Sequence, residues 1–264
     1  DIAPVPTFTN GPEQTTLPPT PEPTPTETSS SPAEHDRSEE RFLTVDSGIM
    51  WRGVAGECGA VAPLLERSTD SGETWIDVTP LYLDVGQLMG VAPFADGQAE
   101  ILAAVGSQCE VQALRTFTQG QFWAPYDDLL AGAEYVAPED GTSVVLSGAP
   151  EPAPCSDARS LRADTEMMAL VCEGSAYARG SDAWTALPAE GATTLALDGA
   201  DVIVAHSADD CEGLALTRYV GADGDSSEDA GCLADVDADA PTTIAISDGE
   251  VFAWSADSLS ITPF

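Results

Sequence analysis

Short apolar runs that follow the same two-residue turn recur along this chain. Asp-Gly precedes such a run at Asp96-Gly97, Asp140-Gly141, Asp198-Gly199 and Asp248-Gly249, and Ser47-Gly48 stands in the same place. Asp-Gly favours tight turns with φ > 0, and runs of about five residues bounded by Gly, Asp, Ser or Pro are typical of strands. No long apolar stripe of helical period competes with them, and residues 127–132 offer one helical turn at most. The chain is therefore expected to be all-β.

The turns recur at roughly 45 to 58 residues, which is the length of a four-stranded propeller blade. A second repeated unit places a Cys before an Arg and then a hairpin, in the pairs Cys58 and Arg67, Cys109 and Arg115, Cys172 and Arg179, and Cys211 and Arg218. The pattern predicts a β-propeller of about five blades, with six as the alternative. We expect the four arginines to brace the outer hairpins, far from a central pocket. The final run, residues 250–261, is expected to pair with residues 42–51 and so complete one blade from both chain ends.

One hairpin carries a recognisable motif. Ser68, Asp70, Gly72, Thr74 and Trp75 read Ser-x-Asp-x-Gly-x-Thr-Trp. The Asp carboxylate can accept backbone N–H bonds within the turn, Gly supplies positive φ, and the indole can cover the turn. Residues 116–123 repeat the hairpin with Gly120 and Trp123 in place and Thr118 instead of the Asp.

This motif resembles the Asp-box of the sialidase-type (BNR-repeat) β-propellers, and the resemblance covers about residues 42–264. It implies a structural role for the box, because the family carries the motif on proteins with unrelated activities. Its catalytic members use three arginines, a Tyr activated by a Glu, and an Asp, with an early Phe/Tyr-Arg-Ile-Pro motif. This chain has no such motif, and only Arg41, Arg52, Arg159 and Arg162 remain to build the triad. We therefore expect a non-catalytic, secreted or membrane-anchored bacterial member.

Residues 1–40 differ in composition from the rest of the chain. They are rich in Pro, Thr and Ser, so they cannot bury enough apolar surface to offset the entropy of ordering. We expect a disordered, extended stalk over residues 1–40 and the propeller over residues 41–264, with a plain tail as the alternative. No run reaches the length of a membrane span, and no signal-peptide pattern opens the sequence.

The charge balance restricts the partners. The net charge is −36, and the sequence contains no Lys. Nucleic-acid binding needs a basic surface, and anionic lipid repels an acidic one. The acidity fits a solvated surface that keeps the protein soluble and monomeric. Adaptation to high salt and an acidic face for a cationic partner are the alternatives.

The six cysteines indicate disulfides rather than a metal site. None lies in a Cys-x-x-Cys pair, and His35 and His206 are the only histidines. An even count beside a stalk-like segment predicts three disulfides in an oxidising, extracytoplasmic compartment. We predict local pairs between Cys155 and Cys172 and between Cys211 and Cys232, and a link between neighbouring blades from Cys58 to Cys109.

The sequence predicts no cofactor. Two acidic runs offer weak calcium candidates in Asp223, Asp225, Asp235 and Asp237, but both lack the Gly and Glu of an EF-hand loop. His206 is expected to be a solvated strand-end residue. The candidate exposed aromatic residues are Phe117, Phe122, Trp123, Tyr126, Tyr135, Tyr219 and Trp254. Trp75, Trp123 and Trp184 are expected in the core, and Tyr126 and Tyr135 could anchor an interface.

These patterns favour an extracytoplasmic, non-enzymatic propeller that binds a protein or a ligand of the cell envelope. The alternatives are a secreted sialidase-like glycoside hydrolase and an assembly factor for an envelope or membrane complex. No catalytic residue is assigned.

Overall fold

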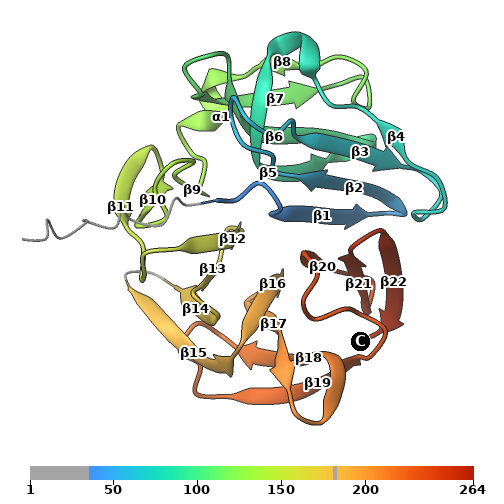
Figure 1. The fold of residues 1–264 in the computed structure, drawn as a ribbon, viewed down its shortest axis with the longest axis vertical. Coiled ribbons are helices and arrows are strands. Elements are labelled where there is room, and N and C mark those ends of the chain that lie inside the picture. The colour runs from blue at the N-terminus through green and yellow to red at the C-terminus, as the bar shows by residue number, and fades with distance from the viewer. Residues whose placement is uncertain (1–35, 181–182) are drawn as a thin grey trace, which may run out of the picture. The chain divides into compact units, whose positions relative to one another are not determined.

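The described chain is a six-bladed β-propeller. The computed structural model describes residues 36–264 except residues 181–182. Within this part, six antiparallel sheets follow one another around a ring (Figure 1). The helical elements there are α1 (Asp127–Leu130) and the 3-10 turns η1 (Leu81–Leu83) and η2 (Ala95–Gly97). The all-β prediction is confirmed, and the blade number is six, the alternative to the expected five.

Four blades have four strands each. Blade 1 contains β1 (Arg41–Asp46), β2 (Ile49–Val54), β3 (Leu64–Ser68) and β4 (Ile76–Asp77). Blade 2 contains β5 (Val85–Phe94), β6 (Gln98–Val105), β7 (Glu110–Thr116) and β8 (Ala124–Pro125). Blade 4 contains β12 (Ala158–Ala163), β13 (Met168–Cys172), β14 (Ser175–Arg179) and β15 (Trp184–Glu190). Blade 5 contains β16 (Ala192–Asp198), β17 (Asp201–Ala208), β18 (Cys211–Val220) and β19 (Ser227–Leu233).

Blades 3 and 6 have three strands each. Blade 3 contains β9 (Tyr135–Val136), β10 (Ser143–Leu146) and β11 (Ala149–Pro152). Blade 6 contains β20 (Thr242–Ser247), β21 (Glu250–Ser255) and β22 (Ser258–Pro263). Blade 3 is the smaller of the two because its strands are only two to four residues long.

Each blade is built from one continuous stretch of chain, so the expected sharing of a blade between the two chain ends is wrong. Residues 250–261 pair with each other and with β20, and β1 pairs with β2. The sequence analysis did not identify β20 (Thr242–Ser247), whose β-branched residues form the inner strand of blade 6. Asp248-Gly249 forms the turn between β20 and β21, as Ser247 faces Glu250 across the hairpin.

The ring closes between blades 1 and 6 through side chains. The guanidinium of Arg41 lies 4.2 Å from the centre of the Trp254 ring. Arg52 lies between two rings, 4.0 Å from Trp75 and 4.8 Å from Trp254. Cation–π contacts of this kind contribute about 0.5–2 kcal/mol each, depending on burial. The junction therefore depends on alternating arginine and tryptophan side chains.

Apolar cores lie between neighbouring blades rather than inside one blade. Among the described residues, five buried clusters join blades 1 and 2, 3 and 4, 4 and 5, 5 and 6, and 6 and 1. Strand residues alternate between two faces, so each blade can offer an apolar face to both neighbours. No such cluster of described residues joins blades 2 and 3. This junction is therefore constructed differently from the other five.

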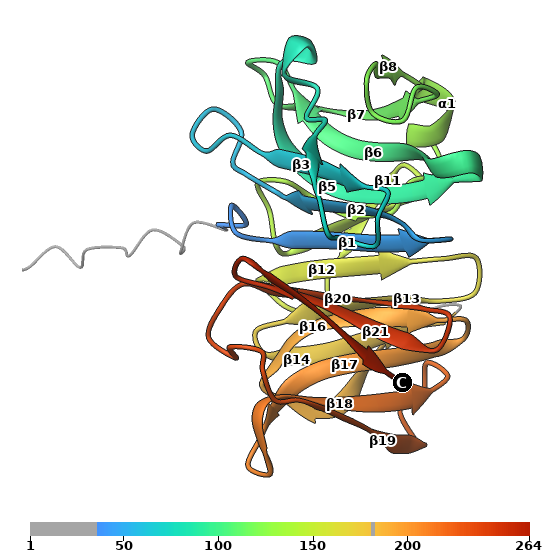
Figure 2. The same ribbon diagram turned by 90° about the vertical axis from the view of Figure 1, so that its right-hand side faces the viewer.

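Residues 36–40, here called the N-terminal segment, pack against inner strands instead of belonging to a free stalk. Arg37, Ser38 and Glu40 are buried. The Ser160 backbone N–H donates to Glu40 Oε1 at 2.8 Å, and Arg37 Nη1 donates to the Val136 carbonyl at 3.2 Å. These bonds link the segment to β12 and β9, and Figure 2 shows it leading into β1. The predicted boundary at residue 40 is wrong because polar side chains, which composition alone assigned to the stalk, are hydrogen-bonded in the fold. The rest of that prediction, residues 1–35, lies outside the described residues.

Candidate functional site

The motif at residues 68–75 folds as the hairpin turn between β3 and β4. Asp70 Oδ1 accepts hydrogen bonds from the Thr74 N–H at 2.9 Å and the Ser68 hydroxyl at 2.7 Å, and Asp70 Oδ2 accepts from the Thr74 hydroxyl at 2.6 Å. These donors, those of Thr74 first, lower the pKa of Asp70 to about 2. Trp75 Nε1 donates to the Gly72 carbonyl at 3.0 Å. The polar side chains of the four motif residues Ser68, Asp70, Thr74 and Trp75 are thus hydrogen-bonded within the turn.

The second hairpin, residues 116–123, reproduces this geometry without the Asp. The Gly120 N–H donates to Thr116 Oγ1 at 2.9 Å, as the Gly72 N–H donates to Ser68 Oγ at the same distance. Thr118 Oγ1 takes the acceptor role of the Asp, receiving the Phe122 N–H at 2.8 Å. The second hairpin therefore shares the hydrogen-bond pattern of the first, because a hydroxyl can replace the carboxylate as the acceptor.

Both hairpins pack against the preceding blade of the ring. Trp123 Nε1 donates to the Val78 carbonyl of blade 1 at 3.1 Å. A Cβ added at Gly120, where φ is +90°, would lie 2.7 Å from the Val78 side chain, and one at Gly72 would lie 2.4 Å from Leu259 of β22. These contacts give the hairpins a structural part in the ring. Trp123 is buried, whereas Trp75 and Trp184 are only partly buried.

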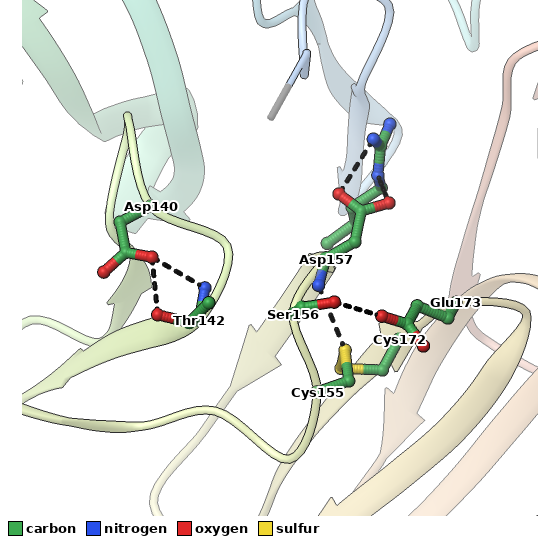
Figure 3. The surroundings of a disulfide bond; sticks show 8 residues. Asp140, Thr142, Cys155, Ser156, Asp157, Cys172 and Glu173 are labelled. Carbon is green, nitrogen blue, oxygen red and sulfur yellow. Dashed lines mark hydrogen bonds and ion pairs between the residues drawn. A yellow bond between two sulfur atoms is a disulfide. The ribbon is translucent and has the colours of Figure 1, made fainter. Parts of the chain in front are cut away.

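Three disulfides connect the cysteines as predicted. Cys58 pairs with Cys109, Cys155 with Cys172, and Cys211 with Cys232. The first joins blades 1 and 2, and the others lie within single blades or at their edges. Figure 3 shows the Cys155–Cys172 bond, beside which Ser156 donates a hydrogen bond to Glu173. Three disulfides suggest an oxidising environment, either extracytoplasmic or lumenal.

A cavity of about 460 Å³ lies beside blade 2, at the junction that lacks an apolar cluster. Small-molecule and cofactor sites in proteins commonly measure ~300–1,000 Å³. Its walls come from β5, β6, β7, α1, the chain after α1, and β12. The lining residues are Met89, Gly90, Val91, Ala92, Glu100, Ile101, Leu102, Ala113, Asp128, Leu129, Gly132, Ala133, Glu134, Leu161, Arg162 and Ala163.

The cavity follows from strand alternation and from the size of blade 3. On β6, Ala99, Ile101 and Ala103 belong to the core between blades 1 and 2, which directs Glu100 and Leu102 to the opposite face. In the other four-stranded blades, the equivalent face is covered by the next blade. Blade 3 has short strands and covers only part of it. We call this face, with Glu100, Leu102 and Ala113, the open face of blade 2.

Charged side chains surround the apolar floor of the cavity. Burial raises the pKa of Glu134, which is consistent with a half-buried carboxyl that has no ion pair in the described chain. Asp128 is exposed on α1, and Glu100 forms an ion pair with Arg115. Arg162 Nη2 donates to the Arg41 carbonyl at 3.2 Å and to Thr243 Oγ1 at 3.1 Å, and the positive charge of Arg162 interacts with the buried carboxylate of Glu40. The cavity therefore combines an apolar floor with carboxylates at its edge.

Aromatic rings lie beside the cavity on the same blade. Phe117 contacts Phe94 and Tyr126, with ring centres 5.7 Å and 5.8 Å apart. The Arg115 guanidinium lies 4.7 Å from the centre of Phe94 and 5.0 Å from that of Tyr126. We call Phe94, Phe117 and Tyr126 the aromatic patch. Because Arg115 pairs with Glu100, which lines the cavity, it connects the patch to the cavity.

The remaining predicted aromatic residues divide by exposure. Phe117 and Phe122 are 56% and 68% exposed, and Tyr126 is 37% exposed. Trp123, Tyr219 and Trp254 are buried instead, because each packs at a blade junction. Tyr135 is half-buried. Of the two predicted anchors, Tyr126 has the exposure that an interface needs.

The other predicted residues do not form a site. Arg41 and Arg52 stack on tryptophans, and Arg159 pairs with Asp157, so these arginines do not converge with Arg162. His206 Nε2 lies 2.8 Å from Thr217 Oγ1 within blade 5. The calcium candidates are exposed, and two of them cap their own turns: Asp223 accepts from the Asp225 N–H and Asp237 from the Asp239 N–H. Among the described residues, no three His, Cys, Asp or Glu side chains are grouped to hold a metal.

Sequence reasoning missed the cavity residues, above all Glu134, Leu102 and Met89. The signal was present in β6, where Glu100 and Leu102 alternate with three buried core residues. The strands of blade 3 also carry the shortest apolar runs. Neither pattern says which blade face remains open, because that depends on how far the neighbouring blade extends.

No helix in the described ranges has the length and apolar character needed to cross a membrane. No protein-family model matches the chain, and no curated protein matches it either. Solved structures with a similar fold include YCF48 bound to D1 peptide, with a TM-score of 0.45 and 16% identity over 83% of this chain and 76% of that one. YCF48 from Cyanidioschyzon merolae gives 0.41 and 14% over 84% and 82%. The Bacillus subtilis arabinanase Arb43A gives 0.42 and 13% over 88% and 97%. These similarities concern the β-propeller fold and carry no information about a ligand or a reaction.

Proposed function

We propose that this propeller is a non-catalytic, extracytoplasmic binding module, secreted or membrane-anchored, whose ligand occupies the open face of blade 2. The observation that carries the proposal is the cavity of about 460 Å³ at the blade junction without an apolar cluster. An uncovered sheet face with an apolar floor and a few polar groups is the usual form of a binding site. The three disulfides support the compartment. A role in assembling an envelope complex would be one use of such a module.

Methionine methyl NMR tests this proposal directly. The chain has four methionines, and Met89 lines the cavity, while Met50 lies buried at the junction of blades 6 and 1. A library of neutral, cationic and anionic small fragments is added to the full chain carrying ¹³C-methyl methionine. Binding at the open face should shift the Met89 signal and leave Met50 in place. The proposal is wrong if no fragment shifts Met89, or if all binding shifts other signals.

A glycoside hydrolase is the second candidate, and one observation favours it. Glu134 and Asp128 lie at the same cavity, and the raised pKa of Glu134 suits a general acid. Turnover of fluorogenic sialosides, arabinosides and xylosides by the full chain, abolished in Glu134→Gln, would establish this activity. Absence of turnover with all three substrates, in protein whose Met89 signal responds to fragments, would favour the binding module.

A further inference from the structure

We propose that the open face of blade 2 binds a polypeptide segment in which basic side chains alternate with apolar or aromatic ones. This inference rests on the proposed function and specifies the ligand of the same site. Four features carry it: the uncovered face, the apolar floor of the cavity, the carboxylates at its edge, and the aromatic patch next to it.

The floor and the edge of the cavity require opposite properties of a ligand. Met89 and Ala113 are buried but face the cavity, and Leu102, Leu129 and Leu161 are partly exposed there. An apolar side chain that enters would remove this surface from water. The carboxylates of Asp128 and Glu134 make no ion pair with any described residue. A basic group would therefore find partners at the edge, whereas an acidic group would be repelled.

The extent of the surface favours a chain over a small molecule. Glu100 lines the cavity and pairs with Arg115, whose guanidinium stacks on Tyr126 of the aromatic patch. Tyr126 also directly precedes α1, which lines the cavity. A small organic cation would occupy the cavity and leave the aromatic patch exposed to solvent. Phe117, 56% exposed, is the kind of aromatic side chain that anchors protein interfaces. A segment that spans both parts uses all of these side chains.

The net charge of −36 extends the same preference beyond the site. A basic segment is attracted toward the whole molecule, and this long-range attraction weakens as salt is added. A second copy of this chain carries the same negative charge and is disfavoured as the occupant. Charge complementarity thus agrees with the local chemistry of the cavity.

Three capped decapeptides test the inference on the full chain, read out by the Met89 methyl signal. In the first, Arg alternates with Leu and Phe; the second carries Glu in place of Arg; the third carries Ser in place of Leu and Phe. We expect the first peptide to shift Met89 and bind at least about tenfold more tightly than the other two. Glu134→Gln and Phe117→Ser should each weaken it about five- to tenfold. The matched surface variants Glu212→Gln and Ile76→Ser, both at exposed positions on other blades, should not change it.

Several results would overturn the inference. If the Glu peptide binds as tightly as the first peptide, the charge argument is wrong. If the Ser peptide binds as tightly as the first peptide, the apolar argument is wrong. Phenethylamine that binds as tightly as the first peptide, without response to Phe117→Ser, would identify a small-molecule site. A Met89 shift that depends on protein concentration alone would identify a second copy. If fragments shift Met89 and no peptide does, this inference is wrong while the binding module stands; if nothing shifts Met89, both are wrong.

Discussion

The buried ion pair of the N-terminal segment should contribute strongly to the stability of the propeller. The side chains of Arg37 and Glu40 are 1% and 3% exposed and form a direct ion pair. Burial raises the pKa of Glu40, but the Arg37 charge and hydrogen bond, the Arg162 charge and the Ser160 N–H together outweigh it and lower the pKa. Two charges about 4 Å apart attract by about 4 kcal/mol at an effective dielectric constant of ~20. The cost of removing both from water offsets much of this.

Breaking the pair should cost more than the pair contributes. In Glu40→Gln or Arg37→Met, one buried charge loses its partner, and we expect the free energy of unfolding to fall by about 3–5 kcal/mol. The double variant leaves neither charge unpaired at this position, so its loss should be well below the sum of the two single losses. Urea unfolding at pH 7 with the disulfides intact measures all three. Arg159→Met is the control, because its ion pair with Asp157 is 39% and 36% exposed and should contribute less than about 1 kcal/mol.

The sign of the pH dependence provides a second readout. The folded pKa of Glu40 lies below its unfolded value, so its stabilising effect is present above about pH 4.3 and is lost as pH falls through the folded pKa. The stability difference between wild type and Glu40→Gln should therefore shrink in acid. Losses below about 1 kcal/mol for both single variants, or strictly additive losses in the double variant, would refute the reasoning.

Three further predictions concern the ring. Replacing both Cys58 and Cys109 by Ser should lower the free energy of unfolding by about 4 kcal/mol, and replacing both Cys155 and Cys172 by about 3 kcal/mol, because the sequence separations are 51 and 17 residues. Thermal unfolding of the two double variants, without reductant, compares the losses, and the reverse order would contradict the argument. Gly120→Ala should destabilise by more than about 1 kcal/mol through positive φ and the approach to Val78, whereas Gly199→Ala, which has positive φ but open space, should cost less. The pKa of Asp70, about 2, means that its turn is stabilised above about pH 4 and loses this as pH falls toward 2; Trp75 fluorescence should report the change in wild type and not in Asp70→Asn.

The sequence predicted what depends on local chemistry. The hairpins at residues 68–75 and 116–123 could be read from their side chains because each turn satisfies its own hydrogen bonds. The Cys58–Cys109 disulfide followed from repeat positions, since equivalent strand ends of adjacent blades lie close together, and the other two followed from their short separations of 17 and 21 residues. The sequence allowed one helical turn at most within residues 127–132, and α1 occupies residues 127–130.

The sequence could not predict what depends on packing between distant segments. The closure of the ring was missed because β20 resembles any other short strand, and its place in blade 6 is fixed only when all blades are counted. The N-terminal segment was missed because Arg37 and Glu40 appear as linker residues until Val136 and Ser160 are beside them. The cavity was missed because an open blade face is defined by a neighbour that is too short to cover it.

The position of the N-terminal segment determines how the propeller would respond to mechanical tension. A pull on residue 36 would first load the Arg37–Glu40 pair and its bonds to β9 and β12, and then β1, the innermost strand of blade 1. A pull on Phe264 would load β22, the last strand of blade 6, whose bonds to β21 can open one after another. The propeller should therefore resist force applied at residue 36 more than force applied at Phe264. Force applied at residue 36 would reach the outer strands of blade 1 last.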